Sequence, residues 1–113
     1  MKTGDLKHKI EFQRLKNVLD DEGFPTDNQK YDTFLKVYAA VNNLYGKEKE
    51  AVKQNISETI VVFHTRYFRN IDEECYILFK GQRYEIIEPP DNIKYLNKEL
   101  KIKAKLQKVQ NGN

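Results

Sequence analysis

Alternating apolar and polar residues near the amino-terminal end predict the first β-strand. Between residues 6 and 14, every second residue suits the buried side of an extended chain: Leu6, His8, Ile10 and Phe12. Charged and amide residues fill the positions between them, as a half-buried strand requires. Residues 6 to 19 also approximate a 3.6-residue apolar stripe, so a helix remains the alternative at this point.

Residues 20 to 28 have the composition of a loop. An acidic run, Asp20, Asp21 and Glu22, is followed within six positions by glycine, proline and asparagine. These residue types favour turns and disfavour regular strands. We therefore expect an exposed, mobile loop that extends over about residues 17–30.

Apolar residues return between residues 31 and 44 and occupy both alternating registers. One register holds Leu35, Val37, Ala39 and Val41, and the other holds Phe34, Tyr38 and Leu44. The pattern predicts a long strand that is either partly buried on both faces or bent by a β-bulge near Ala39 and Ala40.

Residues 46 to 56 differ from their surroundings because helix formers dominate and only Ala51 and Val52 are apolar. A short helix with no core-facing stripe is marginal in water. We expect its order to depend on a neighbouring subunit or partner. This segment supplies our main candidate contacts with a partner or with a channel: Lys47, Glu48, Lys49, Glu50 and Lys53. The acidic run at Asp20, Asp21 and Glu22 is the second candidate.

The remaining chain reads as further strands. Residues 56 to 69 are rich in β-branched and aromatic residues and predict a central strand. Residues 75–80 and 83–88 flank Gly81 and Gln82, which suits a two-residue hairpin with glycine at its first central position. From Leu100 to Leu106, apolar residues alternate with lysines.

Together these elements predict one mainly β domain over residues 1–113, with a frayed tail at residues 110–113. The architecture is a small antiparallel β-barrel or sandwich of about six strands, with one short helix and long loops. Seven residues are expected to belong to the core: Tyr38, Val41, Val62, Phe63, Ile86, Ile102 and Leu106.

Composition and charge narrow the function classes only slightly. Twenty basic and seventeen acidic residues leave a net charge of +3, which selects no partner. Cys75 is the only cysteine, so neither an intramolecular disulfide nor a Cys-based zinc site is expected, and a reducing cytoplasm is the natural setting. No signal peptide and no apolar run of membrane-spanning length is present, so no membrane association is expected.

The sequence offers no catalytic constellation. His8 and His64 each fall on a predicted strand with apolar neighbours, which suits packed sheet residues better than a general base. The acidic runs at residues 20–22 and 72–74 suit solvated loops rather than a catalytic pair. Gly81 lacks the repeated glycines of a phosphate loop. We expect no enzymatic activity, no cofactor and no metal.

A lysine row on the last strand is the one candidate for phosphate contact. Lys101, Lys103 and Lys105 share a face of the predicted strand and could neutralise phosphates. A solvent-facing strand is also commonly rich in lysine, which discourages edge aggregation. This strand has no aromatic residue on which a base could stack, which argues against a nucleic-acid-binding surface.

Five segments, in order, resemble the phage head-tail adaptor family of head-closure connectors. They are the opening Gly4–Gln13; Thr33–Glu48, with its aromatic-Ala-Ala-Val strand and Gly-basic-Glu entry to a helix; Phe63–Tyr67; the Gly-centred hairpin Phe79–Ile86; and the last strand Lys98–Ile102. Tyr38 stands where that family usually has Trp, and Tyr can fill the same packing role.

The resemblance implies a non-enzymatic virion or prophage protein, assembled in the bacterial cytoplasm, that joins the DNA-filled head to the tail and helps close the DNA channel. Its implied partners are portal-adaptor and tail proteins, further copies of itself in a ring of twelve, and DNA in weak, non-specific contact. We expect the isolated chain to be a monomer at micromolar concentration. The alternative is a nucleic-acid-binding β-barrel that uses the lysine row.

Overall fold

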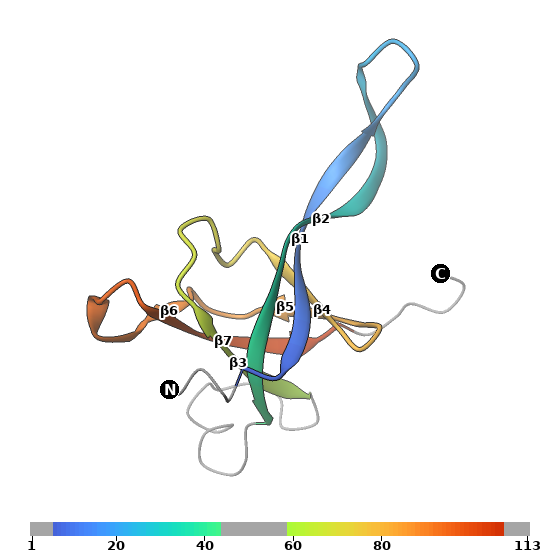
Figure 1. Cartoon of the computed structure of the whole chain (residues 1–113). Coiled ribbons are helices and arrows are strands. Elements are labelled where there is room, and N and C mark those ends of the chain that lie inside the picture. Colours follow the sequence, from blue (N-terminus) through green and yellow to red (C-terminus); the bar gives the residue numbers. More distant parts are fainter. Residues whose placement is uncertain (1–5, 44–58, 108–113) are drawn as a thin grey trace.

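The computed structural model describes residues 6–43 and 59–107 of the chain, and most of these residues lie in seven strands (Figure 1). In chain order the elements are β1 (His8–Leu19), β2 (Pro25–Asn43), β3 (Ile60–Arg66), β4 (Tyr76–Phe79), β5 (Gln82–Ile86), β6 (Asp91–Asn92), a short 3₁₀ turn η2 (Ile93–Tyr95) and β7 (Glu99–Leu106). The strand expected over residues 6–14 is confirmed, and the helical alternative is wrong. The helix expected at residues 46–56 lies outside the described residues.

The strands form one antiparallel sheet that closes on itself. The order is β3-β2-β1-β4-β5-β7-β6, and β3 pairs in addition with β7. Six strands therefore complete a barrel, while the two-residue β6 pairs with Leu100 and Lys101 on β7. The barrel expected from the strand pattern is confirmed. Closure removes the open edges that a flat sheet of this size would expose.

Alternate residues of the barrel strands point inward and form one core. Phe63 and Ile102, which lie opposite each other on β3 and β7, are fully buried, as are Ile10 and Phe12 on β1. Of the seven predicted core residues, four are buried, and Val41 and Leu106 pack partly buried against the core. Tyr38 is 58% exposed, so that prediction was wrong. The barrel interior covers one face of β2, and Val37 and Ala39 occupy that face.

A β-bulge in β2 lies five residues before the predicted position. Phe12 pairs with Leu35, but Gln13 pairs with Thr33, so Phe34 is an extra residue in β2. The pairing around Ala39 is regular, because His8, Lys9 and Ile10 face successive residues there. A bulge bends a strand and increases its twist. Here it bends the β1–β2 ribbon at the point where the ribbon leaves the barrel.

The loop predicted at residues 17–30 is much shorter. β1 continues to Leu19 and pairs with β2 as far as Pro25, which leaves only residues 20–24 as a connection. Cross-strand pairs hold the flanking residues extended although several are polar, for example Asn17 opposite Gln29. The polar composition therefore reflects a solvent-exposed hairpin rather than a loop.

Two smaller expectations also need correction. The β4–β5 hairpin turns at Lys80 and Gly81, not at Gly81 and Gln82, because Phe79 pairs with Gln82. Both turn residues have positive φ, 51° and 77°, as a type I′ turn requires. The connection after β3, which carries the acidic run at residues 72–74 expected in a solvated loop, contributes the buried Ile71 to the core.

Candidate assembly surfaces

The distal half of the β1–β2 hairpin projects away from the barrel as a two-stranded arm (Figure 1). β4 pairs with β1 only at residues 11–13, and β3 pairs with β2 only at residues 40–43. Within the described residues, no third strand pairs with β1 beyond Gln13 or with β2 before Ala40. We call residues 14–33 the arm. A hairpin without a covering layer has few means to hold its shape in water.

One side of the arm's base is held by a buried polar network. Gln13 is 6% exposed, donates a hydrogen bond to Thr33 Oγ1 at 2.9 Å and accepts one from Arg83 Nε at 3.1 Å. The Arg83 guanidinium also lies 3.6 Å from the centre of the Tyr31 ring, whose edge contacts Tyr76. These contacts from β4 and β5 fix the direction in which the arm leaves the barrel.

The other side of the base is tied to the connection between β3 and β4. Arg14 donates to the Asn70 carbonyl at 2.8 Å and to Asp72 Oδ2 at 3.2 Å, and its guanidinium lies over the Phe34 ring. Burial alone would raise the pKa of Asp72, but hydrogen bonds from Arg14, the Glu74 N–H and the Cys75 thiol lower it overall. Burial raises the pKa of the Cys75 thiol, which suits a packed cysteine rather than a reactive one.

The tip of the arm combines a negative charge with exposed apolar side chains. The Asp20 carboxylate accepts hydrogen bonds from the Glu22 and Phe24 N–H groups, both at 2.9 Å, and so shapes the turn. Leu19 and Phe24 are 60% and 63% exposed. Asp20, Asp21 and Glu22 therefore lie at the tip, and their contact with a partner stays a prediction. The sequence analysis did not identify the exposed apolar pair beside them, Leu19 and Phe24. The position of Phe24 between a glycine and a proline, in a turn, could have indicated an exposed aromatic side chain.

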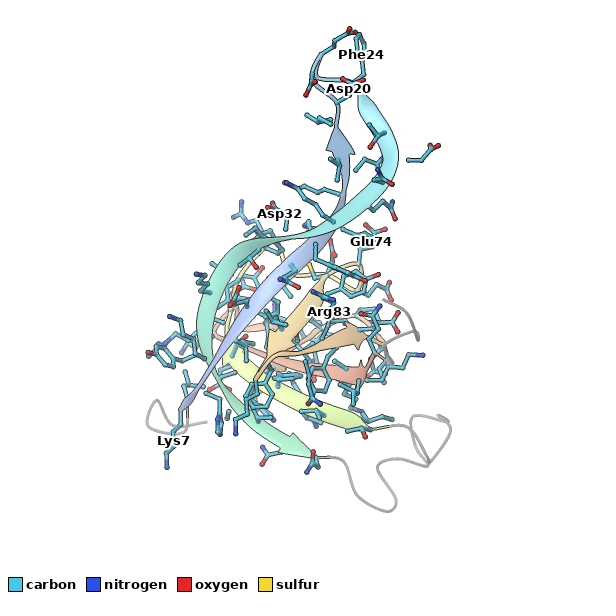
Figure 2. All side chains as sticks on the ribbon, turned by 90° about the vertical axis from the view of Figure 1, so that its right-hand side faces the viewer. Lys7, Asp20, Phe24, Asp32, Glu74 and Arg83 are labelled. Carbon is cyan, nitrogen blue, oxygen red and sulfur yellow. The ribbon has the colours of Figure 1, made fainter. Side chains whose placement is uncertain are left out.

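A pocket of about 850 Å³ lies at the other end of the barrel. β1, β2, β3 and the segment between β6 and β7 contribute to it. Its lining combines apolar side chains (Val41, Ile93 and Leu96) with basic ones (Lys7, Lys94 and Lys98), and two imidazoles, His8 and His64, also face it. Figure 2 shows Lys7 at the opposite end of the molecule from Asp20 and Phe24. This pocket could not be predicted from the sequence, because its lining comes from separated segments of the chain.

One wall of the pocket has a strained backbone. Lys94, Tyr95 and Asn97 have φ values of 56°, 56° and 55°, a conformation that L-residues other than Asn and Asp rarely adopt. Asn92 holds this wall, since its side chain donates to Asn97 Oδ1 at 2.7 Å and accepts from the Asn97 N–H at 3.0 Å. The Tyr95 side chain is 90% exposed. Such strain persists only where neighbouring contacts hold it, and it tends to cluster at binding sites.

The two histidines are strand residues beside this pocket. His8 packs edge-on against Phe79, with ring centres 5.6 Å apart. Burial lowers the pKa of His64, and the nearby charge of Lys101 lowers it further, while Glu99 opposes the change. His64 therefore favours its neutral form. Among the described residues, no cluster of three or more histidine, cysteine or acidic side chains is placed to bind a metal ion.

The lysine row of β7 lies on the outer face of the barrel beside acidic residues. Lys103 forms an ion pair with Glu88 at 3.4 Å. Lys105 is registered opposite Glu85, and Lys101 opposite Asp91. Each lysine thus has a neighbouring carboxylate that weakens its attraction for phosphate.

The other predicted partner contacts, Lys47, Glu48, Lys49, Glu50 and Lys53, lie outside the described residues. In the parts of the chain that the structure describes, no helix is long and apolar enough to cross a membrane.

A family model for phage head completion proteins matches residues 1–107. The chain belongs to this family. No curated protein matches it in sequence. Among solved structures, the head completion protein is similar to protein SF1141 from Shigella flexneri 2a, with a TM-score of 0.73 and 23% identity over 97% of this chain and 100% of that one. A chain of a native gene transfer agent virion is similar with a TM-score of 0.60 and 14% identity, over 93% of this chain and 97% of that one.

Family membership gives the head completion protein a structural role in the phage head. The two solved structures are too distant in sequence to add more than the fold. The resemblance to head-closure connectors inferred from the sequence is thereby confirmed, and the protein is a component of the virion.

Proposed function

We propose that this head completion protein joins the DNA-filled head to the tail and helps to close the DNA channel. It acts as one subunit of a ring that lies between a portal-adaptor protein and a tail protein. The family resemblance implies that this ring contains twelve copies. The observation that carries the proposal is the family match over residues 1–107. The architecture supports it, because a closed barrel is a rigid scaffold, and its projecting arm offers a surface distinct from those of the barrel to a different neighbour.

The protein acts through contacts rather than chemistry. The described residues provide no activated nucleophile and no opposed carboxylate pair. We propose that residues 46–56 approach the channel or a neighbouring ring, where Lys47, Lys49 and Lys53 can meet DNA phosphate weakly while Glu48 and Glu50 limit the affinity.

The experiment is a deletion of the gene in the phage or prophage that encodes it, with complementation by the wild-type protein. We expect heads that package DNA but remain tailless and lose DNA during purification. Electron microscopy and nuclease sensitivity of the packaged DNA measure the two defects separately. Normal tailed particles without the protein would overturn the proposal.

A second experiment uses a variant of the protein to test channel closure. In it, a Gly-Ser linker of equal length replaces residues 47–55. We expect thermal unfolding of the subunit to stay nearly unchanged, while particles leak DNA or fail to join tails. DNA-retaining infectious particles would show that this segment has no such role.

The nucleic-acid-binding alternative is weaker because each lysine of the β7 row has an acidic neighbour. Titration of short duplex DNA at rising salt separates the two functions. Submicromolar binding that fades with salt would favour the alternative.

A further inference from the structure

We propose that the arm tip of one copy docks into the basic pocket of the next copy. The tip comprises Leu19, Asp20, Asp21, Glu22 and Phe24. The inference rests on the proposed ring and names the contact that builds it. Two surfaces of the same chain, at opposite ends of the molecule (Figure 2), match each other in charge, in apolar content and in shape.

The charges are complementary. The tip presents three consecutive carboxylates, Asp20, Asp21 and Glu22. The pocket is lined by Lys7, Lys94 and Lys98, with Glu99 as the one acidic residue among its lining. Opposite potentials steer two surfaces together and fix their register.

The apolar parts also match. Leu19 and Phe24 flank the acidic turn and are exposed in the subunit. In the pocket, Val41, Ile93 and Leu96 lie among the lysines and supply apolar surface. A volume of about 850 Å³ accommodates an aromatic side chain together with part of a tight turn. Docking would bury side chains that a lone subunit leaves in water.

The shapes of the two surfaces suit one another as well. The arm is a narrow ribbon whose end is a five-residue turn held by Asp20. The pocket is a concave site with a wall fixed by Asn92 and Asn97. A projection and a hollow on opposite ends of one chain form a heterologous contact, which generates rings when the rotation closes.

The contact also accounts for the arm's length. A two-stranded hairpin beyond the reach of a third strand gains little stability by itself. A neighbouring copy that binds the tip would bury part of the hairpin surface that no third strand of its own subunit contacts. The small size of the contact agrees with an isolated subunit that is monomeric at micromolar concentration.

The test is thiol cross-linking of the whole protein at high concentration. One chain carries Asp27→Cys on the arm and Tyr95→Cys on the pocket rim; both positions are exposed and neither belongs to the docking set. Cys75 is buried and stays in place. With a short bis-maleimide we expect a ladder of dimers, trimers and larger species, because each copy links to the next. Wild-type protein and each single-cysteine chain alone should give no species beyond a dimer.

Charge reversal decides whether the docking is specific. Asp21→Lys with Glu22→Lys should abolish the ladder, and so should Lys94→Glu with Lys98→Glu. All four substitutions in one chain should restore it. A control chain carries the second cysteine at exposed Lys80, in the β4–β5 turn, and should give no ladder. Absence of a ladder, a ladder unaffected by charge reversal, or an equal ladder from the Lys80 control would overturn the proposal.

The same cross-linker applied to purified particles separates this inference from the proposed function. Particles that require the protein for tail joining but give no link between positions 27 and 95 would leave the function intact and reject the docking. The pocket would then belong to another virion protein.

Discussion

The barrel and the arm share two strands, β1 and β2, yet these strands are stabilised in different ways in the two regions. Within the barrel, β1 and β2 have strands on both sides and bury Ile10, Phe12 and Ala39 completely. Beyond the bulge at Phe34, the same strands continue as a ribbon that carries exposed Leu19 and Phe24. The comparison shows that strand pairing and exposed side-chain contacts set the shape of the arm, whereas burial sets the stability of the barrel.

The largest expected effect comes from truncating the core. Ile102→Ala should lower the free energy of unfolding by about 2–4 kcal/mol, because it removes a fully buried side chain and leaves a cavity. The matched change on the arm, Leu19→Ala, should alter it by less than about 0.5 kcal/mol. Chemical denaturation of both variants measures the difference. Equal losses would show that the arm belongs to the same cooperative unit as the barrel.

The two glycine turns give a sharper comparison. Gly81 and Gly23 have φ of +77° and +90°, and no atom would contact an added Cβ at either. Alanine therefore introduces similar backbone strain at both sites. We expect Gly81→Ala to cost about 1 kcal/mol of global stability. Gly23→Ala should instead raise hydrogen exchange of the Glu22 and Phe24 amides while the melting temperature stays nearly constant. A large fall in melting temperature for Gly23→Ala would break the distinction.

A smaller effect is expected where the arm meets the barrel. Arg14→Gln removes the charged hydrogen bond to Asp72, and the partly exposed pair contributes at most about 1 kcal/mol. Its main consequence should be faster hydrogen exchange of the arm amides. Arg14→Lys keeps the charge but not the two-pronged geometry, and should show an intermediate rate. Unchanged exchange in both variants would mean that the Gln13 network alone holds the arm.

The smallest effect is a pH dependence from the pocket. The folded state lowers the pKa of His64, so the folded protein binds fewer protons than the unfolded chain. Stability from this group is complete above the unfolded pKa of about 6.5 and falls as the pH drops through it toward the folded value. Subtracting the pH profile of His64→Gln, measured by denaturation between pH 5 and 8, isolates this contribution. We expect this difference to grow as the pH rises from 5 to 8, and a difference that stays flat or shrinks toward high pH would contradict the prediction.

The sequence was most informative where burial is one-sided and regular. The alternation in residues 100–106 predicted β7 and its inward side chains. A different signal, the β-branched run, predicted β3, which is buried on both faces over Ile60–Phe63. Prediction from the sequence failed where the residue composition indicates one kind of element and the backbone forms another. The arm reads as a loop because its residues are polar, yet pairing needs only backbone groups, which every residue except proline can supply. Tyr38 reads as core because an aromatic residue beside buried neighbours gives no sign of which face it occupies.

The candidate surfaces were harder to predict from the sequence than the strands were. Asp20, Asp21 and Glu22 could be singled out because they are consecutive. The pocket could not, since His8, Val41, His64 and Leu96 come together only after the barrel closes.

That closure also constrains the order in which the chain can fold. β7 pairs with β3 on one side and with β5 and β6 on the other, and it follows all of these strands in the described part of the chain. During synthesis β1 and β2 can pair early, but the edges of β3 and β5 that pair with β7 stay open until β7 emerges. Contacts between such distant segments slow folding. A nascent or truncated chain that lacks β7 would present two unpaired edges to other chains, so the carboxy-terminal strand protects the protein against aggregation as much as it completes the fold.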